Sequence, residues 1–332
     1  MKSQGLRLTL LAGGVGAAKF VEGLARVLDS RRLTIISNTG DDIERHGLQI
    51  SPDVDIMLYT LAGIVDPAKG WGIRGDTFEA LGRLKSIGEE TWFQLGDRDL
   101  ATHILRTSLR KDGWMATRIT QYLARNLDVC SRILPMTDGT VFTEVQTSAG
   151  WMHFQEFFVK HRCEPEVLDV AFGRGAPPGE PTPEVLDALG TADAIVICPS
   201  NPVASIGPIL SLRGIREELS RSRVPRIAVS PLVGGKSLKG PSDRMMRAKG
   251  FRSDALGVAR FYAGLIDGII LDSADADLEK SIAAEGVSVL VTDTLMTSIE
   301  HKTALAKQTL EWIESLHDKY QHRRSHQKSV RC

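Results

Sequence analysis

The chain has 332 residues, of which 42% are hydrophobic, so it can bury a large core. Its 41 basic side chains are balanced by 41 acidic ones, so it has no net charge that would favour binding to nucleic acid or to an acidic membrane. Its four cysteines lie far apart, without disulfide-like or zinc-like spacing, and are expected to be reduced thiols. No apolar run approaches the roughly 20 residues of a membrane helix, and the first strand begins too early for a signal peptide, so we expect a cytoplasmic α/β protein.

A glycine-rich turn follows the first predicted strand. The apolar run Leu8 to Ala12 meets Gly13, Gly14 and Gly16, and a helical pattern begins at Ala17. A strand, a glycine turn and a helix together offer backbone N–H groups and the positive end of a helix dipole to a phosphate. The dinucleotide fingerprint and the P-loop are both incomplete here, so an ordinary strand-to-helix turn is the alternative.

The second predicted strand, Leu33 to Ser37, ends in a polar loop. A nicotinamide-binding domain would place an acidic residue at the tip of this strand to hold the ribose. Asn38 stands there instead, and Asp41 and Asp42 come later in the loop. This argues against a dehydrogenase.

A second acidic loop, containing Asp53 and Asp55, precedes an apolar helical stretch from Ile56 to Leu61. Either aspartate alone could simply cap that helix. Together with Asp41 and Asp42, however, they place four carboxylates in two loops that are expected to open on the same edge of the sheet. Oxygen ligands of this kind suit Mg²⁺ held beside a phosphate.

The segment from Asp76 to Leu127 is predicted to be a helical insertion between strands. Arg98 follows a glycine turn in this insertion, where it could bind a phosphate or could pair with Asp97 or Asp99. His103 has apolar neighbours on its predicted helix, so it is expected to be a packed histidine and not a catalyst.

Strand-like patterns at Thr140 to Thr147 and at Trp151 to Val159 predict a small additional sheet. The Pro- and Gly-rich stretch 176–183 is the best linker candidate.

A second parallel portion is predicted from four apolar strands, at Ala194 to Cys198, Arg226 to Ser230, Gly268 to Leu271 and Val287 to Val291. Ser200 and Asn201 follow the first of these strands, at the end where open α/β sheets bind ligands. A loop with Gly235, Lys236 and Lys239 follows the second; it could bind another anionic group or be a solvated surface loop. A capping box at 297–300 predicts the start of the last helix.

These patterns predict an α/β fold, a Rossmann-like parallel sheet with helical and small β insertions. We expect a single domain over 1–316, with its core in 1–65 and 185–316, an insertion at about 66–184, and a basic flexible tail at 317–332.

Several motifs in this order, LAGGVGAAKF, NTGDDIERHGLQISPDVD, GWGIRGDTF, LGDRDLATHILR, PSNPVASIGPIL and SPLVGGKSLKGPSDRMM, resemble the 2-phospho-L-lactate transferase family of coenzyme F-420 biosynthesis. The resemblance runs from about Leu8 to Leu316. It implies an Mg²⁺-dependent phosphotransferase whose donor is an acid-activated guanosine diphosphate. The implied acceptor is the terminal ribityl hydroxyl of 7,8-didemethyl-8-hydroxy-5-deazariboflavin, with GMP as the leaving group. A homodimer is expected, and neither nucleic acid nor a membrane is an expected partner.

With that chemistry we assign three groups of site residues. The catalytic candidates are Asp42, Asp53, Asp55 and Arg98. Asp42 and Asp55 are the candidate metal ligands, since the position of Asp41 is less constant in the family. The candidates for binding the phosphates, the guanine nucleotide and other parts of the substrates are Gly13, Gly14, Gly16, Lys19, Asn38, Asp97, Ser200, Asn201, Gly235 and Lys236.

Two other functions are alternatives to this interpretation. The related gluconeogenesis-factor group has a similar glycine loop and would bind a nucleotide without turnover, whereas a nicotinamide dehydrogenase would transfer hydride. The sequence does not distinguish 2-phospholactate, phosphoenolpyruvate and 3-phosphoglycerate as the acid carried, nor which aspartate is a ligand and which is a base.

Overall fold

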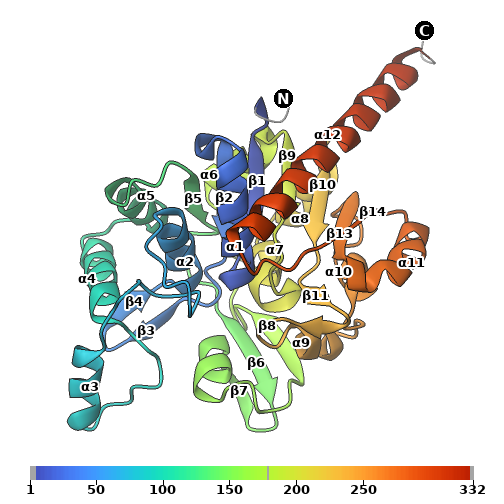
Figure 1. Ribbon diagram of the computed structural model, residues 1–332. Helices are drawn as coiled ribbons and strands as arrows, with labels where there is room; N and C mark the ends of the chain where they lie inside the picture. Colours follow the sequence, from blue (N-terminus) through green and yellow to red (C-terminus); the bar gives the residue numbers. More distant parts are fainter. Residues whose placement is uncertain (1–4, 178, 330–332) are drawn as a thin grey trace.

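The computed structural model describes residues 5–177 and 179–329, with only the backbone course given for 318–329. The last three residues of the predicted tail, 330–332, lie outside the described residues. A seven-stranded sheet forms the centre of the molecule, in the order β14-β13-β10-β9-β1-β2-β5 (Figure 1). Its strands are β1 (Leu8–Ala12), β2 (Leu33–Ser37), β5 (Arg132–Pro135), β9 (Ala194–Ile197), β10 (Arg226–Val229), β13 (Gly268–Asp272) and β14 (Ser288–Thr292).

Every neighbouring pair in this sheet is parallel, which confirms the predicted α/β, Rossmann-like fold. Following the chain from β1, strands β2 and β5 are added toward one edge of the sheet, whereas β9, β10, β13 and β14 are added toward the other edge. The order therefore reverses between β1 and β9. In open parallel sheets the crevice at such a reversal, beyond the carboxyl ends of the strands, is where ligands bind.

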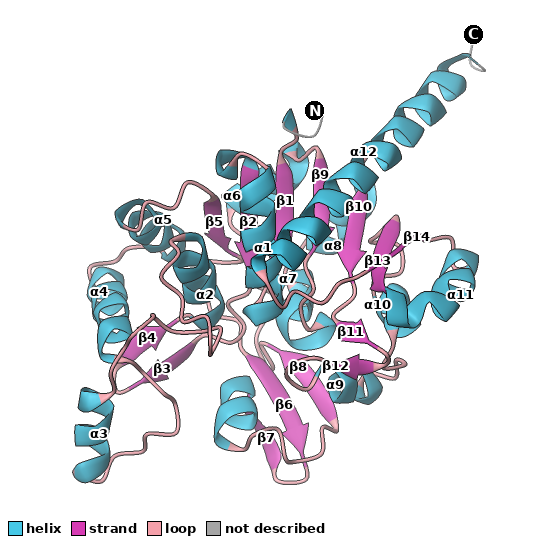
Figure 2. Ribbon diagram, in the orientation of Figure 1, coloured by secondary structure: helices cyan, strands magenta, loops and turns pink. Residues whose placement is uncertain are grey.

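The strands are mostly apolar and mostly buried because helices cover both faces of the sheet (Figure 2). Adjacent residues of β1 enter different cores: Leu10 packs with one cluster and Leu11 with the other. One face is covered by α1 (Gly14–Val27), α2 (Pro52–Leu61), α5 (Ala116–Asn126) and α12 (Ile299–Ser329). The opposite core includes α6 (Pro183–Thr191), α7 (Gly207–Ser211), α8 (Ile215–Arg221), α9 (Ser242–Ala248), α10 (Ala255–Phe261) and α11 (Glu279–Ala284).

The remaining elements lie beyond the carboxyl edge of the sheet (Figure 1). They are the hairpin β3 (Ile43–Arg45) and β4 (Leu48–Ile50), the helices α3 (Glu79–Ser86) and α4 (Asp97–Lys111), the sheet of β6 (Thr143–Thr147), β7 (Gly150–His153) and β8 (Asp169–Phe172), and the hairpin β11 (Leu232–Val233) and β12 (Lys236–Ser237). Short turns of 3₁₀ helix occupy Ser30–Arg32 and Ser273–Leu278, and π-helical turns occupy Glu156–Lys160 and Pro202–Ile206.

Several boundaries differ from the sequence-based expectation. The predicted strand over Trp151 to Val159 is wrong beyond His153, because the chain turns into a π-helical segment in which the buried Phe154 and Phe157 are spaced for a helical turn. Helix α1 begins at Gly14, three residues before the predicted start. Strand β5 comes from the predicted insertion and forms one edge of the central sheet.

The last helix, α12, crosses the face of the sheet against α1 and then extends past the body of the molecule (Figure 1). Ser298 caps it by accepting a hydrogen bond from the His301 N–H at 3.3 Å. Its backbone remains helical to Ser329, where a flexible tail had been predicted from residue 317. Within the described ranges, no helix combines the length and apolar character needed to span a membrane.

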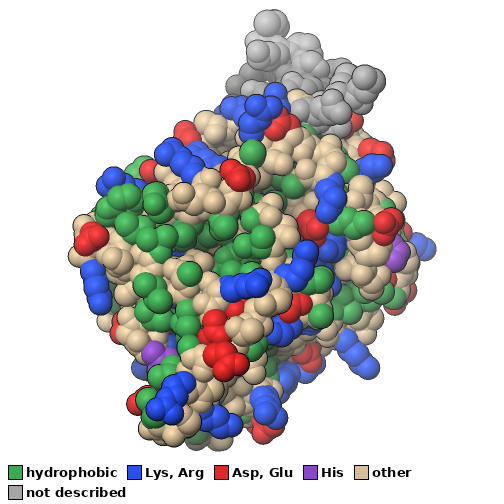
Figure 3. All heavy atoms as spheres, turned by 60° about the vertical axis from the view of Figure 1, so that its left-hand side comes forward, with side chains coloured by type: hydrophobic (Ala, Val, Ile, Leu, Met, Phe, Trp, Pro, Cys, Tyr) green, Lys and Arg blue, Asp and Glu red, His purple; other side chains and the backbone are tan. Residues whose placement is uncertain are grey.

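Figure 3 brings the left side of Figure 1 forward and shows apolar side chains gathered over a broad area of that face. Exposed apolar side chains of α4, α5 and the turn between them include Ile104, Leu105, Met115 and Tyr122. Lysine and arginine are scattered on the visible face and form no continuous basic surface there.

The contact between α1 and α12 yields a test of the fold. A Cβ added to the buried Gly23 would lie 2.2 Å from the carbonyl oxygen of Lys302, a backbone atom that cannot easily move. Gly23→Ala should therefore lower the free energy of unfolding by about 1–3 kcal/mol in urea denaturation. The matched control is Gly82→Ala in the exposed helix α3, where the new Cβ meets nothing within 4 Å. It should raise stability by up to about 1 kcal/mol, so equal effects of the two substitutions would contradict this packing.

Candidate active site

The glycine turn after β1 lies against the loops that follow β2 and β9. Gly13 donates its N–H to the buried Ser200 Oγ at 3.2 Å, and Gly14 donates to Asp53 Oδ1 at 2.8 Å. A Cβ at Gly13 would lie only 2.6 Å from Asp53 Oδ2, and one at Gly16 only 2.4 Å from the Pro199 carbonyl oxygen. Glycine is thus required because three loops converge here. Helix α1 begins at this turn, so its first-turn amides lie at the carboxyl end of β1, beside the crevice between β1 and β9.

Asn38 connects the second strand to this turn. Its side chain is fully buried, and its Nδ2 donates to Asp53 Oδ2 at 2.9 Å while its Oδ1 accepts from the Gly40 N–H at 2.8 Å. Both oxygens of Asp53 are therefore held by hydrogen bonds, one from each neighbouring loop. This fixes the carboxylate between α1 and the end of β2.

Three of the predicted aspartates have an unusual electrostatic environment. Burial, followed by the charge of Asp53, raises the pKa of Asp41 well above its ordinary value. Burial also raises the pKa of Asp42 well above its ordinary value, although a hydrogen bond from Ser51 opposes the shift. Burial raises the pKa of Asp53 to about 6. Shifts of this kind mark sites where negative charge has been left uncompensated.

Two carboxylate oxygens in this group lack hydrogen bonds. Asp42 Oδ2 accepts from Ser51 Oγ at 2.7 Å, but Asp42 Oδ1 and Asp41 Oδ1 are buried and have no hydrogen-bond partner among the described residues. Within the described residues, no three side chains of His, Cys, Asp or Glu form a ready-made metal site. Mg²⁺ usually keeps several waters and needs only one or two carboxylates beside a phosphate, so the two free oxygens of Asp41 and Asp42 fit this ion.

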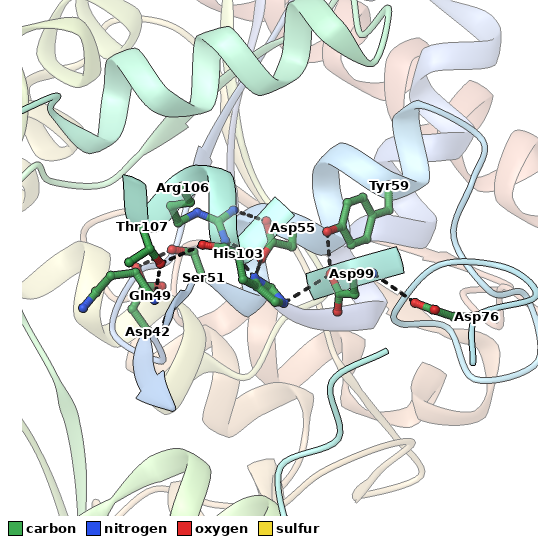
Figure 4. Close-up of polar contacts among 10 residues, drawn as sticks. All are labelled: Asp42, Gln49, Ser51, Asp55, Tyr59, Asp76, Asp99, His103, Arg106 and Thr107. Carbon is green, nitrogen blue, oxygen red and sulfur yellow. Dashed lines mark hydrogen bonds and ion pairs between the residues drawn. The ribbon is translucent and has the colours of Figure 1, made fainter. Parts of the chain in front are cut away.

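The fourth aspartate, Asp55, has a different partner from the expected metal. Both of its oxygens accept hydrogen bonds from the buried Arg106 on α4, one of them at 3.0 Å (Figure 4). A bidentate guanidinium satisfies both charge and geometry at a carboxylate. Asp55 is thus neutralised by the protein itself, and its free neighbours Asp41 and Asp42 are better placed to hold a cation.

A line of polar contacts continues from Arg106 along α4 (Figure 4). His103 lies between two carboxylates, with Nδ1 3.8 Å from Asp55 Oδ2 and Nε2 3.2 Å from Asp99 Oδ1. Asp99 also accepts from the hydroxyl of Tyr59 at 2.5 Å. Burial raises the pKa of Tyr59, so the phenol keeps its proton and donates. As expected, His103 is a packed residue, 1% exposed.

Arg98 and Asp97 have structural contacts of their own. The exposed Arg98 donates to the Arg74 carbonyl oxygen at 3.0 Å, and it forms an ion pair with neither Asp97 nor Asp99 in the described chain. Asp97 accepts from Thr77 Oγ1 at 2.6 Å and from two backbone amides at the start of α3. These contacts lower the pKa of Asp97 and make it a helix cap. Neither residue has a hydrogen bond to the four site aspartates among the contacts of the described residues.

The remaining predicted binding residues follow the strands on either side of the crevice. Asn201 Oδ1 caps the turn after β9 by accepting from the N–H groups of Val203 and Ala204. Gly235 has φ +72° in the tight turn between β11 and β12, and Lys236 beside it is exposed. Lys19 is half-buried on α1, where burial and then the charge of Lys239 lower its pKa.

A pocket of about 310 Å³ adjoins the carboxylates, and its lining does not include the three glycines of the glycine turn. Asp42 and Ser51 contribute to its wall, together with Arg106 and Arg110 from α4. The two arginines were not identified from the sequence. The spacing of Asp99, His103 and Arg106 on one face of a helix is the signal that could have revealed a buried polar stripe there.

Comparison with known proteins gives a consistent result. The family model described as "2-phospho-L-lactate transferase CofD" matches residues 8–310. A phosphoenolpyruvate transferase of Streptomyces griseus is 39% identical over 317 residues, covering 94% of this chain and 99% of that protein. A 2-phospho-L-lactate transferase of Methanosarcina mazei is 39% identical over 300 residues, covering 90% of this chain and 98% of that protein.

A solved structure from Bacillus halodurans, described as a member of the upf0052 family, is similar with a TM-score of 0.57. The two chains are 16% identical, and the match covers 87% of this chain and 92% of that one. At this identity the likeness concerns the fold alone.

The buried ion pair of Asp55 and Arg106 can be tested by its contribution to stability. Arg106→Met would leave the Asp55 carboxylate buried without its counter-charge, and should lower the free energy of unfolding by about 3–5 kcal/mol. The double variant Asp55→Asn with Arg106→Met should recover at least half of this loss because no buried charge remains. Arg174→Met is the control, since it breaks an ion pair with Glu144 whose arginine is 50% exposed, and it should cost less than about 1 kcal/mol. Urea denaturation of the four proteins measures these differences, and a small loss in Arg106→Met would contradict the pairing.

Proposed function

Because this chain belongs to the 2-phospho-L-lactate transferase CofD family, we propose that it transfers a phospho-acid group from a guanosine-diphosphate-activated donor to a deazaflavin in coenzyme F-420 biosynthesis. The proposed acceptor is the terminal ribityl hydroxyl of 7,8-didemethyl-8-hydroxy-5-deazariboflavin, and the leaving group is GMP. The observation that carries this proposal is the buried carboxylate cluster between the glycine turn and the 310 Å³ pocket.

The donor is proposed to bind in the crevice between β1 and β9. Helix α1 begins there, and its first-turn amides other than that of Gly14, which donates to Asp53, are proposed to donate to the oxygens of a diphosphate. Lys19 on the same helix adds positive charge, and its pKa is lowered first by burial and then by the charge of Lys239. Ser200 and Asn201 end the neighbouring strand, and the exposed Lys236 extends from the adjacent hairpin, so these residues are proposed to hold the guanine nucleotide.

The acceptor is proposed to bind in the pocket on the other side of the carboxylates. Asp42 is part of the pocket wall, whereas Asp53 contacts the glycine turn through the Gly14 N–H. A hydroxyl at the inner end of the pocket would then meet the diphosphate across this cluster. Alignment of two bound reactants accounts for much of the rate enhancement in phosphoryl transfer.

The reaction joins the acceptor hydroxyl oxygen to the phosphorus that carries the acid. The bond from that phosphorus to the bridging oxygen breaks, and GMP leaves with this oxygen. The hydroxyl proton passes to a carboxylate, for which Asp53 is the proposed base because a pKa of about 6 suits proton transfer near neutral pH. First-turn amides and Lys19 stabilise the charge on the leaving phosphate.

A magnesium ion is proposed to be held by Asp41 and Asp42, whose free oxygens fit it. When bound, it supplies positive charge that offsets the phosphates and the uncompensated carboxylates. Asp55 was also a candidate metal ligand. We propose that it instead stabilises this loop through its ion pair with Arg106.

The reaction class is tested by product analysis. The purified protein with Mg²⁺, the deazaflavin and each candidate donor should release GMP in step with a phosphodiester of the deazaflavin, as followed by chromatography and mass spectrometry. The mass of the product also identifies the acid carried. Release of pyrophosphate would make the enzyme a guanylyltransferase, and tight nucleotide binding without any turnover would favour a regulatory protein.

The role of Asp42 is tested by Asp42→Asn, which keeps the shape of the side chain but removes its charge. Turnover should fall by roughly 10² or more, and a higher Mg²⁺ concentration should be needed, while the deazaflavin affinity changes little. Steady-state rates at several Mg²⁺ concentrations measure this. Asp169→Asn is the control, because it removes the same charge from a partly exposed ion pair with Lys249. Full activity with an unchanged Mg²⁺ dependence in Asp42→Asn would rule out its proposed role.

A further inference from the structure

The two arginines in the pocket wall differ in how their charges are compensated. Arg106 donates to both oxygens of Asp55, so its charge is matched. Arg110 donates only to backbone carbonyls, to Asp138 at 2.9 Å and to Trp114 at 3.3 Å. Across the described ranges no carboxylate forms an ion pair with Arg110. The pocket therefore contains one guanidinium whose positive charge is available to a ligand.

The same pocket wall also contains acceptor oxygens. Asp42 and Thr39 both contribute to it, and within the described residues each has a buried side-chain oxygen without a hydrogen-bond partner. Glu44 is a second carboxylate of the wall, and its Oε2 accepts from Gln49 Nε2 at 2.8 Å. Burial raises the pKa of Asp42, and the nearby charge of Arg106 opposes that shift. Arg110 lies four residues beyond Arg106 on α4, about 6 Å further along the helix axis, so the pocket wall combines acceptor oxygens with a more distant guanidinium.

Apolar side chains also line the pocket. Val54 and Ile119 are almost fully buried behind its surface, and Phe142, which is 42% exposed, adds an aromatic ring. A flat, largely apolar ring system with a polar chain at one end and delocalised negative charge would match these three kinds of group. Small-molecule pockets commonly combine apolar walls with a few placed polar groups in this way.

The proposed acceptor has this distribution of groups. Its ribityl chain carries the hydroxyl that reacts. Its ring hydroxyl is conjugated through the tricyclic system with ring carbonyls, which makes it a vinylogous acid whose anion is spread over the ring. A planar, delocalised guanidinium pairs well with such an anion.

We propose that Arg110 is a specificity-determining residue, which selects a hydroxylated deazaflavin ring by pairing with its delocalised negative charge while the ribityl chain extends toward Asp42. This inference rests on the proposed function, because it assigns one residue to recognition of the acceptor. It also gives a physical basis for distinguishing the acidic deazaflavin from a neutral flavin-like ring of nearly the same shape.

The test compares two rings and three variants. Binding to the purified full chain is measured by fluorescence titration with 7,8-didemethyl-8-hydroxy-5-deazariboflavin and with the same deazaflavin lacking the ring hydroxyl. Arg110→Gln should weaken binding of the hydroxylated ring by roughly 10- to 100-fold and change binding of the other ring by less than about threefold. Arg110→Lys, which keeps the charge but loses the planar fork, should be intermediate.

Arg118→Gln is the matched control. Arg118 is exposed on α5 and stacks on the Trp114 ring at 3.7 Å outside the pocket, so its removal takes away the same charge nearby and should alter binding of neither ring. Thermal unfolding of each variant checks that the fold survives. Wild-type protein should itself prefer the hydroxylated ring, a result that does not depend on any substitution.

Distinct results would overturn the inference. Equal losses for both rings in Arg110→Gln would mean that Arg110 only supports the backbone at Trp114 and Asp138. A loss confined to binding of the guanosine-activated acid would assign Arg110 to the carboxylate of the donor. If wild-type protein binds and modifies the deazaflavin but Arg110→Gln binds it equally well, only this inference fails. If wild-type protein does not bind the deazaflavin at all, the proposed acceptor fails with it.

Discussion

The carboxylates of Asp41, Asp42 and Asp53 lie beside one another at the carboxyl edge of the sheet, where Asp41 and Asp53 are buried and Asp42 is half-buried, so that loss of water disfavours their charged forms. Isolated negative charge in such a place is costly unless a cation or a proton accompanies it. In the described part of the chain, the aspartate of this group that forms an ion pair is the neighbouring Asp55, with Arg106. The unbalanced part of the cluster is therefore a place where a bound cation, or a proton taken from a substrate, improves the electrostatics.

The order of the strands explains why this cluster lies next to both the glycine turn and the pocket. The chain reverses direction across the sheet between β1 and β9, which opens a crevice where the glycine turn, the loop after β2 and the loop after β9 meet. Asp53 contacts the glycine turn from one side, and Asp42 faces the pocket on the other. His153 from the small sheet supports this arrangement, since its Nε2 lies 3.1 Å from the Asp42 carbonyl oxygen. The site is thus held by segments from several distant parts of the sequence.

The parallel sheet and the additional elements have separate roles in this arrangement. Strands β1, β2 and β9 position the glycine turn and the aspartates, whose geometry depends on strand pairing. Helix α4, from the insertion between β2 and β5, provides Arg106, which matches the charge of Asp55, and Arg110, which has no carboxylate partner among the described residues. The lining of the pocket therefore depends on α4, whereas the glycine turn depends on the sheet. This separation is common in α/β enzymes, where loops and insertions carry specificity on a rigid sheet.

The sequence by itself was sufficient to predict the parallel α/β fold and the shared edge of its polar loops. Short apolar runs ending in glycine or polar residues are local patterns, and parallel strands necessarily bring such ends together. The same reasoning correctly predicted that Asp41, Asp42, Asp53 and Asp55 would gather. The local sequence pattern did not predict contacts between residues that are far apart in the sequence. Asp55 is paired with Arg106, 51 residues away, and Asp97 caps α3. The local pattern also failed at Phe154 and Phe157, whose burial in a helical turn depends on the core around them. Only the tertiary structure decided which charges were compensated, because compensation depends on side-chain distances that sequence spacing does not contain.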